Sequence, residues 1–147
     1  MNLSSRPALN PAFAQVPRII LLVEDEPFVR EATRCILEGA GFNVLTAEDA
    51  TAALHVYKEC GRAIDLLMTD MVLPGRTGEE LGQDLRQRSP TIKVLITSGY
   101  SSTEGAFDEP ATQTHFLAKP YSRRGLLDKV DEIFRGEPLH RVAGQAG

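Results

Sequence analysis

Short apolar runs alternate with longer amphipathic stretches through most of the chain. Apolar runs that are bounded by turn signals or polar residues are typical of strands buried on both faces of a sheet. The predicted strands cover residues 18–23, 42–47, 65–70, 92–97 and 114–118. The run at 65–70 is the central one, because it ends on Asp70 and a Pro74-Gly75 turn signal follows directly.

The stretches between the apolar runs carry apolar residues at helical spacing. Asp49 and Ser122 precede two of them, where a side-chain oxygen can cap a helix, and Pro27 suits the first turn of another. The first predicted helix begins at Pro27, and the others cover residues 50–60, 78–88, 101–113 and 123–135. The helix at 101–113 is the weakest prediction, because Gly105 and Pro110 both disfavour a helix interior.

Regular alternation of strands and helices predicts an α/β fold. We expect a five-stranded parallel sheet with helices on both faces and right-handed crossovers. The chain has 147 residues, which suits one domain. The predicted division is a flexible N-terminal extension at 1–17, one domain at 18–136 and a C-terminal tail at 137–147.

Charge and composition narrow the class of protein. The net charge of −4 argues against nucleic acid as a main partner, since nucleic-acid-binding domains usually carry a basic face. No apolar run approaches the ~20 residues of a membrane span, and no apolar signal core begins the chain, so we expect no membrane association. Cys35 and Cys60 are predicted to be reduced packing residues of a cytoplasmic protein.

Polar residues follow most of the predicted strands. Glu24-Asp25-Glu26 follows the first strand, Asp70 ends the third, Thr97 and Ser98 end the fourth, and Lys119 follows the fifth. Because the carboxyl ends of parallel strands meet at one edge of a sheet, these side chains can converge.

This set of groups suits phosphoryl chemistry beside a metal. Crowded carboxylates repel each other without a cation, and hard oxygen ligands select Mg²⁺ or Mn²⁺. A lysine and a hydroxyl can hold the remaining phosphoryl oxygens. Asp70 can act as the nucleophile toward phosphorus, which gives an acyl phosphate.

The same residues carry a resemblance to a known family. The carriers are Leu21-Leu22-Val23-Glu24-Asp25-Glu26-Pro27, Asp70 with Pro74-Gly75 and Gly78, Ile96-Thr97-Ser98-Gly99-Tyr100, and Phe116-Leu117-Ala118-Lys119-Pro120-Tyr121. In this order and spacing, from about Arg18 to Arg135, the chain resembles the receiver domain of bacterial two-component response regulators. The resemblance implies a flavodoxin-like (βα)5 fold. The segment Thr97-Ser98-Gly99-Tyr100 is similar to that of receivers in hybrid histidine kinases.

The resemblance assigns a role to each site residue. It implies that Asp70 is the phosphoacceptor, charged by a histidine kinase or a histidine phosphotransfer protein. Mg²⁺ would be bound by Asp25, Asp70, the backbone carbonyl of Val72, and Glu24 either directly or through water. Thr97 and Lys119 would hold the phosphoryl oxygens, the Lys119–Pro120 bond would be cis, and Phe116 would be the switch aromatic residue that moves with Thr97.

Some positions depart from the usual pattern of this family. Glu24 stands where aspartate is frequent, and Phe116 lacks the hydroxyl of a tyrosine. Val72 and Gly99 stand at positions whose side chains tune dephosphorylation in the family, and neither can orient an attacking water. We therefore expect a long-lived phosphoryl group.

The resulting hypothesis is a stand-alone receiver, a signalling protein that takes part in its own phosphorylation and dephosphorylation but is not otherwise an enzyme. Phosphorylation would change its affinity for a downstream protein, and the chain would be a monomer or weak dimer. The alternatives are a receiver excised from a hybrid histidine kinase, a degenerate receiver that binds constitutively, and a phosphatase with an aspartate nucleophile. Such phosphatases usually place a second aspartate where Val72 stands. His115 is predicted to be a partly exposed strand residue, not a ligand.

Overall fold

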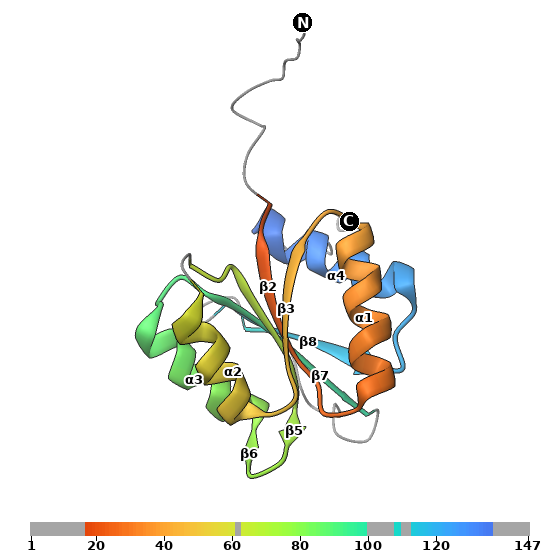
Figure 1. The fold of residues 1–147 in the computed structure, drawn as a ribbon. Helices are drawn as coiled ribbons and strands as arrows, with labels where there is room; N and C mark the ends of the chain where they lie inside the picture. The colour runs from red at the N-terminus through yellow and green to blue at the C-terminus, as the bar shows by residue number, and fades with distance from the viewer. Residues whose placement is uncertain (1–16, 61–62, 100–107, 110–112, 137–147) are drawn as a thin grey trace, which may run out of the picture.

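The computed structural model describes residues 17–60, 63–99, 108–109 and 113–136. A twisted sheet lies at the centre of the molecule (Figure 1). The strands are β2 (Ile19–Val23), β3 (Asn43–Ala47), β4 (Leu66–Asp70), β7 (Lys93–Gly99) and β8 (Thr114–Lys119). They pair in the order β3-β2-β4-β7-β8, and every pair is parallel. The predicted five-stranded parallel sheet is therefore confirmed.

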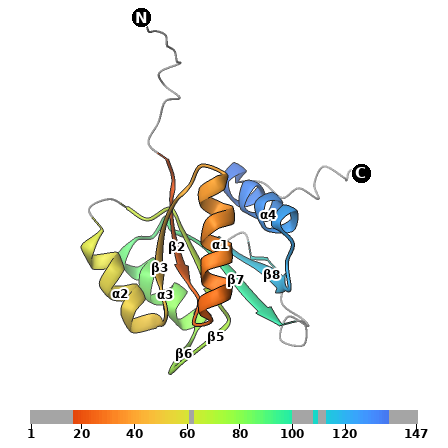
Figure 2. The same ribbon diagram turned by 45° about the vertical axis from the view of Figure 1, so that its right-hand side comes forward.

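Helices cover both faces of this sheet, as predicted. α1 (Pro27–Gly39) and α4 (Arg123–Arg135) lie on one face, and α2 (Ala50–Glu59) and α3 (Gly78–Arg88) lie on the other (Figures 1 and 2). The side chains of Asp49 and Ser122 accept hydrogen bonds from the backbone N–H groups of Ala52 and Gly125, each at 2.8 Å. These caps fix where α2 and α4 begin.

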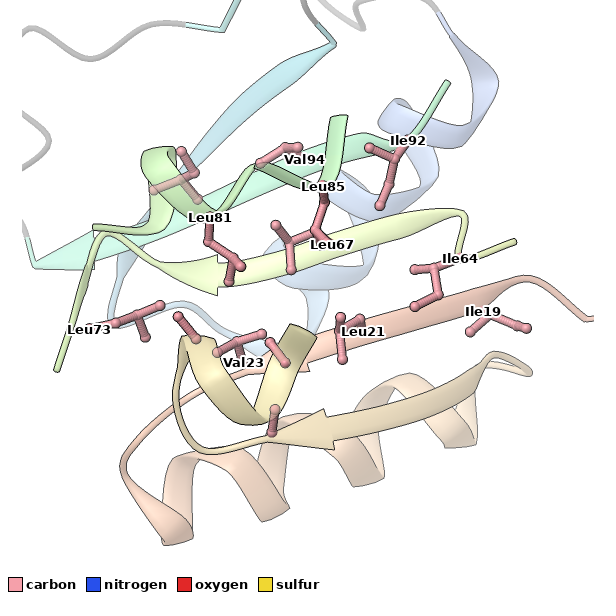
Figure 3. Close-up of a cluster of buried hydrophobic side chains, with 14 residues drawn as sticks. Ile19, Leu21, Val23, Ile64, Leu67, Leu73, Leu81, Leu85, Ile92 and Val94 are labelled. Atoms are coloured by element: carbon pink, nitrogen blue, oxygen red, sulfur yellow. The ribbon is translucent and has the colours of Figure 1, made fainter. Parts of the chain in front are cut away.

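Two apolar layers, one on each face of the sheet, form the core. Leu21, Leu67 and Leu81 belong to the layer under α2 and α3 (Figure 3), whereas Leu66 and Met68 belong to the layer under α1 and α4. Successive strand residues point to opposite faces. Both faces are covered by helices, so every position of the central strands is apolar until β2 and β4 reach their carboxyl ends.

The predicted helix at 101–113 lies largely outside the described residues. Only residues 108, 109 and 113 of it are described; none is helical, and Glu109 forms an isolated bridge with Thr114. Pro110 follows Glu109 and disfavours the helical conformation of the residue before it. A short hairpin, β5 (Val72–Leu73) and β6 (Arg76–Thr77), surrounds the predicted Pro-Gly turn and was not predicted.

Cys35 and Cys60 do not form a disulfide with each other. Cys35, however, is exposed on α1 rather than packed, because it lies on the same outer face as Glu31, one turn earlier in the helix. None of the described helices is long and apolar enough to cross a bilayer.

Candidate functional site

The topology gathers the polar strand ends at one edge of the sheet. β2 and β4 are neighbours, but the chain passes from β2 to a helix on one face and from β4 to a helix on the other. Such a divergence leaves a crevice beyond the strand ends, where ligands bind in open α/β sheets. Register also aligns the site, because Asp70 pairs with Thr97 and Gly99 pairs with Lys119.

Lys119 lies between two carboxylates that are remote in sequence. Its Nζ is 2.5 Å from Asp70 Oδ1 and 3.1 Å from Glu24 Oε1. Thr97 Oγ1 donates a hydrogen bond to the same Asp70 oxygen at 3.1 Å. Glu24, Asp70 and Thr97 are buried, with relative exposures of 3%, 7% and 2%. Ionised side chains with so little exposure need partners of this kind, since an unpaired buried charge is costly.

Asp25 adds a third carboxylate from the exposed side of the crevice. Ligand oxygens of Glu24, Asp25 and Asp70 lie within 4.8 Å of one another. An all-oxygen set with one exposed member fits a hard divalent cation that retains water ligands, as Mg²⁺ does. These residues therefore have the donor chemistry that a magnesium ion requires.

Burial and neighbouring charges shift the pKa values of Glu24 and Lys119. Burial raises the pKa of Glu24, and the neighbouring Asp70 raises it further, against the lowering effect of the Glu26 N–H. Burial alone would lower the pKa of Lys119, but its hydrogen bonds to Asp70 and Glu24 outweigh this and raise it. Lys119 is therefore a cation wherever these carboxylates are ionised.

Backbone contacts fix the segments that carry the carboxylates. Arg30 Nη1, on α1, donates to the backbone oxygen of Glu24 at 2.7 Å. On the opposite side, a Cβ built on Gly78 would lie 2.1 Å from the backbone oxygen of Asp70. A side chain at 78 would therefore collide with the end of β4. The position of Asp70 depends on close approach of the first residue of α3 to the strand.

The other predicted site residues surround this centre. Val72 is 70% exposed and lines a cleft of about 250 Å³ together with Asp70, Thr97, Gly99 and Lys119. The adjacent Ser98 is also buried, and its Oγ has no hydrogen-bond partner in the described structure. The Lys119–Pro120 bond is cis, as predicted.

Phe116 is not part of the centre itself. It is half-buried on β8, pairs in register with Ile96, and packs against the apolar layer of α2 and α3. The predicted switch residue is thus one strand position away from the level of Thr97.

Three contributors were not identified from sequence as parts of the site. Arg30 was assigned only to the outer face of its helix, and Thr33 and Tyr121, whose hydroxyls are 2.9 Å apart, were not paired. The Thr33–Tyr121 contact joins segments 88 positions apart, so no local sequence pattern signals it. Arg30 follows Glu24 by only six residues, but its helical spacing indicated no more than an outward-facing side chain. The one available signal was the tyrosine directly after Lys119-Pro120, because a buried tyrosine hydroxyl usually finds a hydrogen-bond partner.

Comparison with known proteins decides the family. Residues 20–131 match the family model of the response regulator receiver domain. The chain belongs to this family. The match runs from the second residue of β2 to Asp131 in α4 and contains every residue of the acidic centre.

The relatives of this receiver domain include hybrid kinases and response regulators. It is 36% identical over 115 residues to the sensor kinase CckA of Brucella abortus, covering 78% of this chain and 12% of CckA. The crystal structure of a receiver domain from the hybrid histidine kinase CckA has a TM-score of 0.67 and 34% identity, covering 78% of this chain and 97% of that one. The structure of the response regulator TrrA from Thermotoga maritima in complex with Mg²⁺-BeF has a TM-score of 0.67 and 27% identity. The match covers 79% of this chain and 98% of TrrA.

The chain spans about half the length, or less, of curated relatives that it matches. The similarity therefore concerns their receiver portions. The activities of those whole proteins do not transfer with it.

Proposed function

We propose that this receiver domain accepts a phosphoryl group on Asp70 from a histidine kinase or a histidine phosphotransfer protein. The observation that carries the proposal is the contact of Lys119 Nζ with Asp70 Oδ1 at 2.5 Å, within a centre that also holds Thr97 and two further carboxylates. A buried nucleophile beside a fixed cation and a hydroxyl donor is the arrangement that phosphoryl transfer requires.

The proposed metal ligands are Glu24, Asp25, Asp70 and the backbone carbonyl of Val72. Mg²⁺ bound there would neutralise charge on the phosphoryl oxygens, and Mn²⁺ has similar ligand preferences. The support is the oxygen-only donor set and its separation of at most 4.8 Å for the three carboxylates. The complex of TrrA with Mg²⁺-BeF shows that a related receiver fold binds both components.

The chain's own residues then perform the transfer. An Asp70 carboxylate oxygen attacks phosphorus, a P–O bond forms, and the P–N bond to the donor imidazole breaks, with the electron pair leaving on nitrogen. Lys119 turns its ammonium from Asp70 to a phosphoryl oxygen, and Thr97 donates its hydroxyl to another. Both groups already lie within 3.1 Å of Asp70, so little reorganisation is needed.

A donor protein needs a surface beside this cleft. Phe28, at the start of α1, is 86% exposed, and with Val29, Ala32, Ile36 and Pro120 it lines a largely apolar hollow of about 530 Å³ next to Lys119. Exposed apolar surface of this kind marks protein contacts. We assign it to the phosphodonor.

Phosphorylation would then bias a two-state switch. Movement of Thr97 toward the phosphoryl group would leave space for Phe116, and the change would alter the β8 surface that a downstream protein contacts. We assign this function to residues 18–136 as one domain, acting in the cytoplasm as a monomer or weak dimer. Cys35 and Cys60, which are not joined by a disulfide, are compatible with that reducing compartment.

A receiver belonging to a hybrid histidine kinase is the second candidate, favoured by the similarity to CckA. It would use the same chemistry on Asp70, and the genomic reading frame distinguishes the two. A phosphatase is disfavoured, because the residue two positions after Asp70 is the exposed, apolar Val72, which can neither donate nor accept a proton.

Binding of beryllofluoride, a phosphoryl analogue, tests the proposal. With Mg²⁺ present, we expect it to shift the backbone NMR signals of Thr97, Phe116 and Lys119 in the wild type. Asp70→Asn, which keeps the side-chain size but removes the charge, should abolish these shifts. Asp131→Asn, at an exposed carboxylate on α4, is the matched control and should bind like the wild type. Absence of shifts in the wild type would favour a degenerate binding module.

A further inference from the structure

Helix α1 is joined to both sides of the acidic centre. Near its start, Arg30 donates to the backbone oxygen of Glu24 at the end of β2. One turn further, Thr33 Oγ1 and the hydroxyl of Tyr121 are 2.9 Å apart, although 88 positions separate them in the chain. Thr33 is 2% exposed and Tyr121 is half-buried, so the second contact is largely shielded from water.

Lys119 depends on the segment that this contact holds. It ends β8, the edge strand, while Asp70 ends β4, and β7 lies between them. The Lys119 side chain must therefore reach across β7 to place its Nζ at Asp70 and Glu24. A small shift of the chain after β8 would be carried directly to the ammonium group.

Tyr121 follows Lys119 by two residues and lies just before Ser122, which caps α4. The segment is thus fastened to α4 by the cap and to α1 by the tyrosine hydroxyl. The aromatic ring packs against the apolar layer under α1 and α4, and a phenylalanine would keep that packing. The hydroxyl fixes the position of the segment more narrowly than the ring does. A hydrogen bond requires a particular distance and angle, whereas apolar side chains can shift against each other and stay packed.

We propose that the Thr33–Tyr121 hydrogen bond positions Lys119 for contact with the phosphoryl group. The inference rests on the proposed function of Asp70. In this arrangement Thr33 and Tyr121 are positioning residues: neither touches the metal ligands or the phosphoryl oxygens. Loss of the bond should weaken the interaction of Lys119 with a phosphoryl analogue and leave the carboxylates able to bind metal.

The test compares two affinities in four variants of the full chain: Tyr121→Phe, Thr33→Val, the double variant, and Thr33→Ser, which retains a hydroxyl. The first affinity is that of beryllofluoride at saturating Mg²⁺. The second is that of Mg²⁺ alone. Thermal unfolding of each variant shows that it is folded at the temperature of the titrations.

We expect Tyr121→Phe and Thr33→Val each to weaken beryllofluoride binding by about three- to tenfold, the factor that corresponds to one lost hydrogen bond. The double variant should lose no more than either single one, since both remove the same bond. Thr33→Ser should bind like the wild type, and the affinity for Mg²⁺ alone should change less than twofold.

Wild-type affinity for beryllofluoride in both single variants would overturn the inference, even if their stability fell. Equal weakening of Mg²⁺ and beryllofluoride binding would overturn it too, because it would indicate general damage to the site. A wild type that binds no beryllofluoride would instead refute the function proposed for Asp70.

Discussion

Val72 and Gly99 line the cleft beside Asp70 and bring no hydrogen-bonding side chain to it. Hydrolysis of an acyl phosphate needs a water placed in line with the phosphorus atom, and a polar side chain at either position could hold one. We therefore predict that phosphoryl loss from the isolated Mg²⁺-bound protein is slow. Val72→Asn should shorten the lifetime several-fold, as followed by loss of label. A wild-type lifetime of only seconds would contradict this.

A second titratable cluster lies apart from the acidic centre. Asp108 Oδ2 is 2.6 Å from Lys129 Nζ and 3.3 Å from His115 Nδ1, and its other oxygen accepts the N–H of Phe116 at 2.9 Å. Glu132 completes the group. The ammonium of Lys129 already neutralises the charge of Asp108. We therefore interpret this cluster as an ion-pair network with a structural role. As predicted, His115 is a partly exposed strand residue, with 13% of its side chain accessible.

His115 makes stability depend on pH. Burial lowers its pKa, and the opposing effect of the Asp108 carboxylate does not restore it. The unfolded chain, with a histidine pKa of about 6.5, then binds more protons than the folded one just below that pH. The free energy of unfolding should therefore fall as the pH drops through that range. The charged groups that face His115 are Asp108, Lys129 and Glu132.

Denaturant unfolding between neutral and mildly acidic pH measures this effect. His115→Gln should have a shallower loss of stability on acidification than the wild type. His55→Gln, at an exposed position on α2, controls for the loss of a histidine as such. Parallel curves for wild type and His115→Gln would show that His115 does not contribute.

At the scale of elements, the junction between β4 and α3 is the least tolerant of change. Gly78→Ala would bring its Cβ to 2.1 Å from the Asp70 backbone oxygen and 3.0 Å from Thr69 Cγ2. The helix start or the strand end must move, so we expect a loss of about 1–3 kcal/mol of unfolding free energy and weaker beryllofluoride binding.

The control for this substitution is Gly39→Ala at the end of α1, where nothing lies within 4 Å of the added atom. It should be neutral or slightly stabilising, by up to about 1 kcal/mol. Both free energies come from the same denaturant titration. Equal stability of the two variants would mean that the close approach at Gly78 is not a constraint.

The elements also show what sequence patterns can predict. α3 and α4 begin and end where predicted, because Thr77 and Ser122 cap them and Ser89 and Gly136 end them. β7 runs to Gly99, two residues past the predicted end, because its partner β8 continues to Lys119. The β5–β6 hairpin has strands of two residues, too short to produce a periodic signal. Contacts such as Thr33–Tyr121 depend on how the helices pack against the sheet, and no local sequence pattern specifies them.

At the scale of the whole molecule, a single rule accounts for the site. Parallel pairing brings the carboxyl ends of β2, β4, β7 and β8 to one edge, so Glu24, Asp70, Thr97 and Lys119 meet there although they span most of the domain. Their proximity follows from the strand-end pattern of the sequence. Their roles in phosphoryl transfer stay predictions, since proximity alone does not establish reactivity.

Covalent labelling of Asp70 tests the central claim most directly. The full chain is incubated with a small phosphodonor such as acetyl phosphate, with Mg²⁺ or with a chelator, and any acyl phosphate is trapped by borohydride reduction. Tandem mass spectrometry should then locate a single reduced site at Asp70, dependent on Mg²⁺ and lost in Asp70→Asn. No incorporation, or incorporation at another residue, would contradict the account.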